Sequence, residues 1–282
     1  MKVKEAIHWG IEELKKKDIQ EARLKVYILL SHILQKDRSY LLGYEEEEIE
    51  KKKQEVYQEG IRKLQDNIPI AYVIRNREFM GLSFEVNEHV LIPQPDTEIL
   101  VEKVLELTKN TSDLSILDLC TGSGCIGISL AYYHEKANVT LSDISKEALE
   151  VAKKNAERLQ VSSHTSVIAS NLFENIAKDK QFDVIVSNPP YIASAVIPTL
   201  DKEVQKEPHL ALDGGEDGLS FYKRIIQEAG NYLKEEGYLA LEIGYDQKES
   251  VMQLMQKTGQ YKKITTLQDL AGKDRAIIAK KG

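Results

Sequence analysis

The sequence predicts an α/β protein, in which a small helical bundle precedes a doubly wound, mostly parallel sheet of seven strands. Three observations lead to this fold class. Up to about residue 75, apolar residues recur every three or four positions, as they do in amphipathic helices. Beyond Ser112, short β-branched runs alternate with helical segments, which is the pattern of a parallel sheet. A short link over residues 268–274 joins the last two strands and predicts one antiparallel strand.

Composition limits the classes of protein to which the chain can belong. Its 282 residues are enough for two domains. A net charge of −7 argues against a protein that grips a phosphate backbone over a broad surface. No apolar run approaches the roughly 18 residues that a membrane crossing needs. Cys120 and Cys125 match neither a metal knuckle nor a redox pair. We therefore expect a cytoplasmic protein with reduced thiols, no metal and no membrane contact.

The amino-terminal part, residues 1–75, is predicted to be a helical domain. The apolar positions with helical spacing are Val3, Ile7, Ile11, Leu14, Leu24, Tyr27, Leu30 and Leu34. A third segment with weaker periodicity runs from Glu45 to Leu64, and its acidic start suits the positive end of a helix dipole. No cluster of catalytic residue types occurs here, so packing or partner docking is the expected role.

Residues 76–95 are predicted to form a β-hairpin linker. Its expected strands are 82–86 and 89–92, joined by Asn87 and Glu88. The prolines at 93 and 95 then precede a helix for which Asp96 or Thr97 would be the N-cap. The second domain is expected over residues 96–282. Its seven strands are predicted at 115–119, 138–141, 166–169, 182–187, 237–243, 261–267 and 275–280.

The ends of the first three strands predict a nucleoside-binding site. After the first strand comes a glycine loop, in which glycines let the backbone approach a ligand at a helix amino terminus; it consists of Cys120, Thr121, Gly122, Ser123 and Gly124. Asp143 ends the second strand, where its carboxylate could accept both hydroxyls of a ribose or could cap the next helix. Leu172 follows the third strand and would lie against an adenine ring. Together with Gly127, the loop also satisfies the dinucleotide pattern G-x-G-x-x-G, which is weak evidence alone.

The fourth strand, residues 182–187, ends in Asn188, Pro189, Pro190 and Tyr191. Neither proline can donate a backbone N–H, so the strand must stop there. The amide oxygen of Asn188 and the carbonyl of Pro189 could accept both N–H bonds of one planar –NH₂ group, with Tyr191 as a flat surface for that group and Pro190 stiffening the loop. A simple strand-to-loop turn would explain the same residues.

This tetrapeptide separates two cofactor classes. A nicotinamide dehydrogenase needs an acid/base group beside its hydride site, and no such group is evident. An Asn-Pro-Pro-Tyr beside an adenosine pocket instead suits the transfer of a methyl group from S-adenosylmethionine to a nitrogen, with Asn188 near both donor and acceptor.

Several motifs together resemble class I S-adenosylmethionine-dependent methyltransferases, and among them the bacterial release-factor glutamine methyltransferases of the PrmC/HemK family. Besides the glycine loop, Asp143 and the tetrapeptide, the segments that carry the resemblance are 69–72, 78–79, 91–98 and 207–219. The resemblance implies a Rossmann-like sheet of order 3-2-1-4-5-7-6. It also implies methylation of the Gln side chain in the Gly-Gly-Gln motif of class-1 release factors, with the helical domain helping to recognise the factor.

The family's cofactor loop falls on residues 120–124, its ribose carboxylate on Asp143 and its adenine-facing position on Leu172. Two residues depart from the family pattern: Cys120 stands where Gly is common, and Gln94 replaces a common Arg. We expect a monomer that binds no nucleic acid. Two other functions stay open from the sequence, an adenine-N6 nucleic-acid methyltransferase and a non-catalytic module that binds the cofactor and docks a translation factor. The loop 207–219 is either plain turn chemistry or a flap over the substrate.

Overall fold

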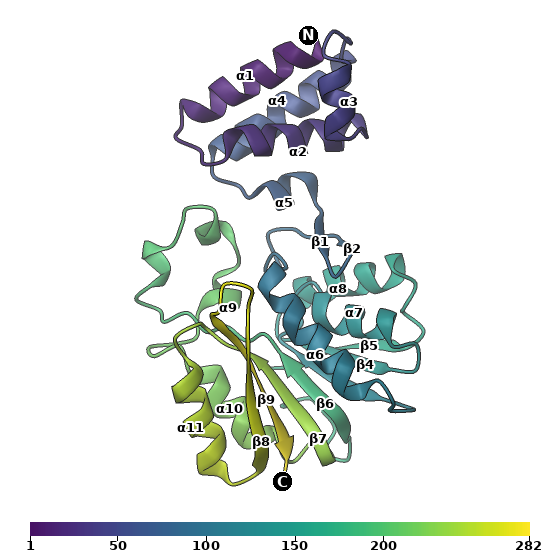
Figure 1. Ribbon diagram of the computed structural model, residues 1–282, viewed down its shortest axis with the longest axis vertical. Helices are drawn as coiled ribbons and strands as arrows, with labels where there is room; N and C mark the ends of the chain where they lie inside the picture. Colours follow the sequence, from purple (N-terminus) through teal and green to yellow (C-terminus); the bar gives the residue numbers. More distant parts are fainter. The chain divides into compact units, whose positions relative to one another are not determined.

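The computed structural model describes all 282 residues, which divide into two compact units. The first unit comprises residues 1–76 and the short segment 201–206; the second comprises residues 77–200 and 207–282. The helices α1 to α5 belong to the first unit and the large sheet belongs to the second (Figure 1). None of the helices combines the length and apolarity that a bilayer crossing requires.

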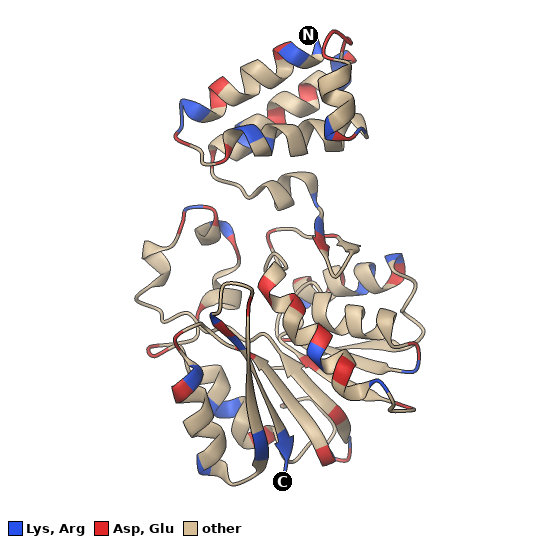
Figure 2. Ribbon diagram, viewed as in Figure 1, with Lys and Arg blue, Asp and Glu red and all other residues tan.

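The first unit buries the apolar faces of its helices against one another. The helices are α1 (Val3–Lys15), α2 (Ala22–Leu34), α3 (Arg38–Gly43), α4 (Lys51–Gln65) and α5 (Ile70–Ile74). The Tyr57 ring is fully buried among them, and its hydroxyl donates to the Ala6 carbonyl at 2.8 Å. Acidic and basic residues are interspersed over the outer surface of these helices (Figure 2).

The predicted third helical segment, residues 45–64, begins too early, because α4 starts only at Lys51. The acidic run before it instead fixes the chain's amino terminus. Glu46 forms ion pairs with Lys2 and Lys4, and the carbonyl of residue 47 accepts from the Val3 N–H at 3.0 Å. The Glu46 carboxylate therefore has lysine partners rather than a helix amino terminus.

A β-hairpin does occur in this region, at the start of the second unit, but its strands differ from those predicted. They are β1 (Arg77–Phe79) and β2 (Leu82–Phe84), with Met80 and Gly81 at φ angles of 52° and 68° in the turn. Two consecutive positive φ angles are typical of tight hairpin turns. Residues 89–92, predicted to be a strand, have no strand partner.

The seven-stranded sheet has the predicted order. Its strands are β3 (Ser115–Leu119), β4 (Asn138–Asp143), β5 (Thr165–Ala169), β6 (Phe182–Ser187), β7 (Leu233–Glu242), β8 (Tyr261–Gln268) and β9 (Asp274–Lys281). They lie in the order β5-β4-β3-β6-β7-β9-β8, which is 3-2-1-4-5-7-6 when the strands of this sheet are counted along the chain. Strand β9 runs antiparallel to both of its neighbours, as the short last link predicts. The carboxyl ends of β3, β4, β5 and β6 therefore meet at one edge.

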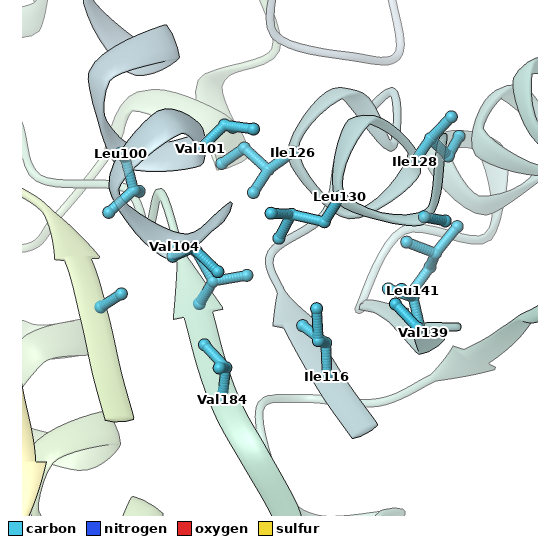
Figure 3. Packing of buried hydrophobic residues seen from close by; sticks show 14 of the residues in the cluster. Leu100, Val101, Val104, Ile116, Ile126, Ile128, Leu130, Val139, Leu141 and Val184 are labelled. Atoms are coloured by element: carbon cyan, nitrogen blue, oxygen red, sulfur yellow. The ribbon is translucent and has the colours of Figure 1, made fainter. Parts of the chain in front are cut away.

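Helices cover both faces of this sheet. On one face, α6 (Glu98–Thr108), α7 (Cys125–Tyr133) and α8 (Lys146–Arg158) enclose an apolar core that includes Val104, Ile116 and Val184 (Figure 3). On the other face, α10 (Ser220–Ala229) and α11 (Lys248–Thr258) pack over Leu117, Ile185 and Leu239. Four short helical turns complete the structure: η1 (Pro95–Thr97), η2 (Ile197–Thr199), η3 (Val204–Lys206) and α9 (His209–Leu212).

Candidate active site

A cavity of about 240 Å³ opens at the carboxyl edge of the sheet, where ligands bind in open α/β folds. The predicted site residues that line it are Cys120, Thr121, Gly122, Ser123, Asp143, Leu172, Asn188 and Pro190. Three further predicted residues, Gly124, Pro189 and Tyr191, do not belong to its lining. The structure thus brings together one group from each of the four strand ends.

The glycine loop turns through three left-handed residues. Cys120, Gly122 and Gly124 have φ angles of 57°, 53° and 82°. A Cβ on Gly122 would meet nothing within 4 Å, so this residue leaves the cavity open for a ligand. A Cβ on Gly124 would lie 2.5 Å from the Ile128 side chain, so Gly124 is needed for packing at the start of α7. The left-handed conformation of Cys120 costs on the order of 1–3 kcal/mol, which explains why glycine suits this position.

Asp118, at the end of β3, holds the loop in this shape. One oxygen of its buried carboxyl accepts hydrogen bonds from the Thr121 hydroxyl at 2.6 Å and from the Gly127 N–H at 2.9 Å. Burial raises the pKa of Asp118 to about 7, and these two hydrogen bonds only partly offset that shift. Asp118 lies two residues before the glycine loop, and its supporting role was not predicted from the sequence.

Asp143 lies across the loop from Asp118, at the end of β4. Its two oxygens accept from the Gly122 and Ser145 N–H groups, both at 2.9 Å. The N-cap of α8 is Ser145, whose hydroxyl accepts from the Ala148 N–H at 3.1 Å, so Asp143 does not cap that helix. Burial raises the pKa of Asp143. Each carboxylate oxygen retains a second lone pair for a ligand hydroxyl.

Apolar side chains border the cavity next to Asp143. Ile144 is 52% exposed and Leu172 is buried, and both line the cavity. The Asn171 side chain also lines the cavity, and both of its polar atoms have protein partners: its oxygen accepts from Arg224 at 3.0 Å and its NH₂ donates to Glu174 at 2.7 Å. Sequence analysis missed Ile144, although an apolar residue directly after the strand-end carboxylate was the available signal.

A second wall comes from residues 88–94, which sequence analysis took for half of a hairpin. The Ile92 N–H donates to the Glu207 carboxyl at 2.8 Å, which fixes this segment without a strand partner. Burial raises the pKa of Glu207 to about 7. The predicted N-cap is confirmed in position, because Thr97 is the N-cap residue of α6, but neither predicted side chain caps the helix. Asp96 pairs with Arg275 at 3.0 Å, and the buried Thr97 hydroxyl makes no capping bond.

The tetrapeptide of residues 188–191 is held in place by the core and by neighbouring loops. Asn188 is half-buried and lines the cavity, whereas the Tyr191 ring packs against the core on the α10 side of the sheet. The Tyr191 carbonyl accepts from the Gln247 side chain at 2.9 Å. Gly214 and Gly218, in the loop 207–219, approach the tetrapeptide so closely that a Cβ on either would lie within 3 Å of its backbone. This loop supports the backbone of the tetrapeptide.

Adding one methyl group at Gly214 tests this support. In a Gly214→Ala variant the new Cβ would meet backbone atoms of Tyr191, Gly218 and Pro190 at 2.8–2.9 Å, which no side-chain rotation can relieve. Overpacking of this kind costs typically about 1–3 kcal/mol, so we expect a lower free energy of unfolding in urea. Gly43→Ala is the matched control, because a Cβ there meets nothing within 4 Å. Equal stability of the two variants would contradict the close packing described.

Comparisons with known proteins agree with this geometry. Residues 94–216 match the family model "Methyltransferase small domain", and residues 5–74 match "PrmC N-terminal domain". A release factor glutamine methyltransferase of Clostridium botulinum is 40% identical over 283 residues, covering 100% of both chains. The chain belongs to the release factor glutamine methyltransferase family. A second member, from Clostridium acetobutylicum, is 42% identical over 236 residues and covers 83% of each chain.

Solved structures agree on the fold of this family member. A methyltransferase from Pyrococcus furiosus covers 80% of this chain and 98% of its own, with a TM-score of 0.55 and 21% identity. The hMettl16 catalytic domain, in complex with a MAT2A 3'UTR hairpin, covers 74% of this chain and 79% of its own, with a TM-score of 0.59 and 18% identity. These structures support the Rossmann-like sheet alone, and membership of the family makes the chain an S-adenosylmethionine-dependent methyltransferase.

Proposed function

We propose that this methyltransferase transfers a methyl group from S-adenosylmethionine to the side-chain amide nitrogen of the Gln in the Gly-Gly-Gln motif of class-1 release factors. The observation that carries the proposal is the position of Asn188 in the cavity lining, at the end of β6 and directly before Pro189. The Asn188 side-chain oxygen and the Pro189 carbonyl would supply two acceptors, which match the two N–H bonds of one carboxamide. The name shared by the relatives, release factor glutamine methyltransferase, supports a glutamine of a release factor as the methyl acceptor.

The residues of the cavity fit the methyl donor. Asp143 offers free lone pairs to the two ribose hydroxyls, and the apolar Ile144 and Leu172 suit an adenine ring. The open space at Gly122 admits the part of the ligand that crosses the glycine loop. When bound, S-adenosylmethionine supplies a sulfonium-activated methyl group.

The protein's contribution is to orient an unreactive nucleophile. An amide nitrogen attacks poorly because its lone pair is delocalised into the carbonyl. Acceptance of both N–H bonds by the Asn188 oxygen and the Pro189 carbonyl would fix the nitrogen and favour the positive charge that grows on it. Bound S-adenosylmethionine would supply the methyl group and leave as S-adenosylhomocysteine, and the substrate nitrogen would lose one proton to solvent. No side chain need act as a base, and orientation alone can lower a barrier by roughly 7–11 kcal/mol.

The two prolines and Tyr191 shape this acceptor site. Pro190 lines the cavity, and we assign it the stiffening of the loop. Because Tyr191 lies outside the cavity lining, we assign it support of the loop rather than stacking on the amide. The helical unit of residues 1–76 is proposed to recognise the release factor, and the enzyme is proposed to act as a monomer without nucleic acid.

A side-by-side methylation assay tests the substrate class. Purified enzyme and methyl-labelled S-adenosylmethionine are incubated with a class-1 release factor, with the same factor carrying Asn in place of the Gln, and with double-stranded DNA and RNA. We expect label in the unaltered factor alone. Label in DNA or RNA would favour an adenine-N6 methyltransferase, and no label anywhere would favour a non-catalytic binding module.

A further inference from the structure

A buried carboxyl group, Glu242, lies directly behind the proposed methyl-acceptor site. Strand β7 lies beside β6 and ends at Glu242. Ser187 of β6 is paired with Leu241 of β7, so the next residues of the two segments, Asn188 and Glu242, are neighbours across the sheet. Two residues earlier on these strands, Val186 and Ala240 face the α6 side of the sheet. By the two-residue period of strands, Glu242 is directed to that same side, and Asn188 is the first residue after β6.

No ordinary structural role explains this carboxyl group. Glu242 is 4% exposed, and its Oε2 atom has no hydrogen-bond partner. The nearby guanidinium of Arg275 is already paired with Asp96 at 3.0 Å and with Asp269 at 2.9 Å. A buried, incompletely paired carboxyl group destabilises a fold. Such groups are retained mainly where function needs them.

The neighbours of Glu242 connect it to the cavity. The side chains of Thr97 and Asn188, which both line the cavity, are among the neighbours that lower the pKa of this carboxyl group. Burial, and after it the charge of Glu242, raises the pKa of the Tyr191 hydroxyl. Glu242 itself does not line the cavity, so it would act on a ligand only through these residues.

Building on the proposed function, we propose that Glu242 is a positioning residue that fixes the orientation of the Asn188 side-chain amide. An asparagine amide can rotate so that either its oxygen or its NH₂ group faces the cavity. Only the oxygen can accept an N–H bond from the substrate glutamine. A carboxylate behind Asn188 accepts from the NH₂ group alone, and it thereby directs the oxygen to the substrate.

This role predicts a dependence on the charge of Glu242. Burial raises its pKa to about 7, and the Thr97 side chain and Arg275 partly offset that shift. Below that pH the protonated carboxyl can donate to the Asn188 oxygen and turn the amide the wrong way. The titratable or charged groups that influence Glu242 or are influenced by it are Asp96, Cys125, Tyr191, Tyr222 and Arg275. We therefore expect kcat to rise with pH through about 7.

The test is a Glu242→Gln variant, which keeps the shape but offers its own NH₂ group to the Asn188 oxygen. We expect kcat for the release factor to fall about 10- to 100-fold, as small misplacements of reacting groups do. KM for S-adenosylmethionine should not rise and the melting temperature should not fall. The increase of kcat with pH near 7 should disappear. Asp183→Asn is the matched control, because it alters a carboxylate at the opposite end of β6 that pairs with Lys234 at 2.7 Å.

A second measurement needs neither substrate nor turnover. In the free wild-type protein, the Asn188 side-chain NH₂ resonances, assigned by their loss in Asn188→Ala, should titrate near pH 7 and stop titrating in Glu242→Gln. Wild-type kcat and pH profile in Glu242→Gln, or NH₂ resonances indifferent to Glu242, would overturn this inference and leave the proposed function intact. An inactive wild-type enzyme whose NH₂ resonances titrate as expected would overturn the proposed function alone.

Discussion

Replacing Asn188 with alanine is expected to lower kcat by about 100-fold or more, which is the usual cost of losing one hydrogen-bonding group aimed at developing charge. The reason is geometric. The Asn188 oxygen is one of only two acceptors proposed to hold the substrate amide, and the Pro189 carbonyl alone cannot fix its plane. Steady-state methylation of a release factor measures the change.

The dissociation constant of S-adenosylmethionine should stay nearly unchanged in this variant, because the ribose and adenine contacts are proposed to come from Asp143, Ile144 and Leu172. Calorimetry checks this point. An Asn175→Ala variant is a suitable control, since Asn175 is exposed and does not line the cavity. Wild-type turnover in Asn188→Ala would remove Asn188 from the mechanism.

Replacing Asp143 with alanine is expected to weaken the binding of S-adenosylmethionine at least about 10-fold, since a hydrogen bond to a charged group contributes roughly 1.5–3 kcal/mol. The variant loses the proposed acceptor for both ribose hydroxyls. It also frees the Gly122 N–H that Asp143 holds at 2.9 Å, which loosens the glycine loop. Calorimetric titration of the donor into the variant measures the loss.

Glu147→Ala serves as the control for Asp143→Ala, because Glu147 is an exposed carboxylate in the first turn of α8 and does not line the cavity. Melting temperatures of both variants show whether the fold is intact. Unchanged donor affinity in a folded Asp143→Ala protein would reduce Asp143 to a purely structural residue.

The sheet could be predicted from sequence because its signals are local. Runs such as residues 182–187 are bounded by turn residues, and their alternation with helices leaves few possible topologies. The resemblance to a known family supplied the strand order, which the structure confirms. The strand ends that line the cavity could be predicted from the same alternation of strands and helices, because parallel strands place their carboxyl ends at one edge of the sheet.

The features that could not be predicted depend on partners distant in sequence. Residues 89–92 look like a strand, but the bond from Ile92 to Glu207 joins positions 115 residues apart. The turn at Met80 and Gly81 carries no Asn-Gly or Asp-Gly signal. Glu242 reads as the end of an apolar strand, and its place behind Asn188 emerges only from the register of β6 and β7.

The most direct test of the central claim is to locate the transferred methyl group. A class-1 release factor is incubated with the enzyme and isotopically labelled S-adenosylmethionine, digested, and analysed by tandem mass spectrometry. The account predicts one added methyl on the amide nitrogen of the Gln in the Gly-Gly-Gln peptide, and none after incubation with Asn188→Ala. A methyl group on any other residue of the factor, or none on this Gln, would contradict it.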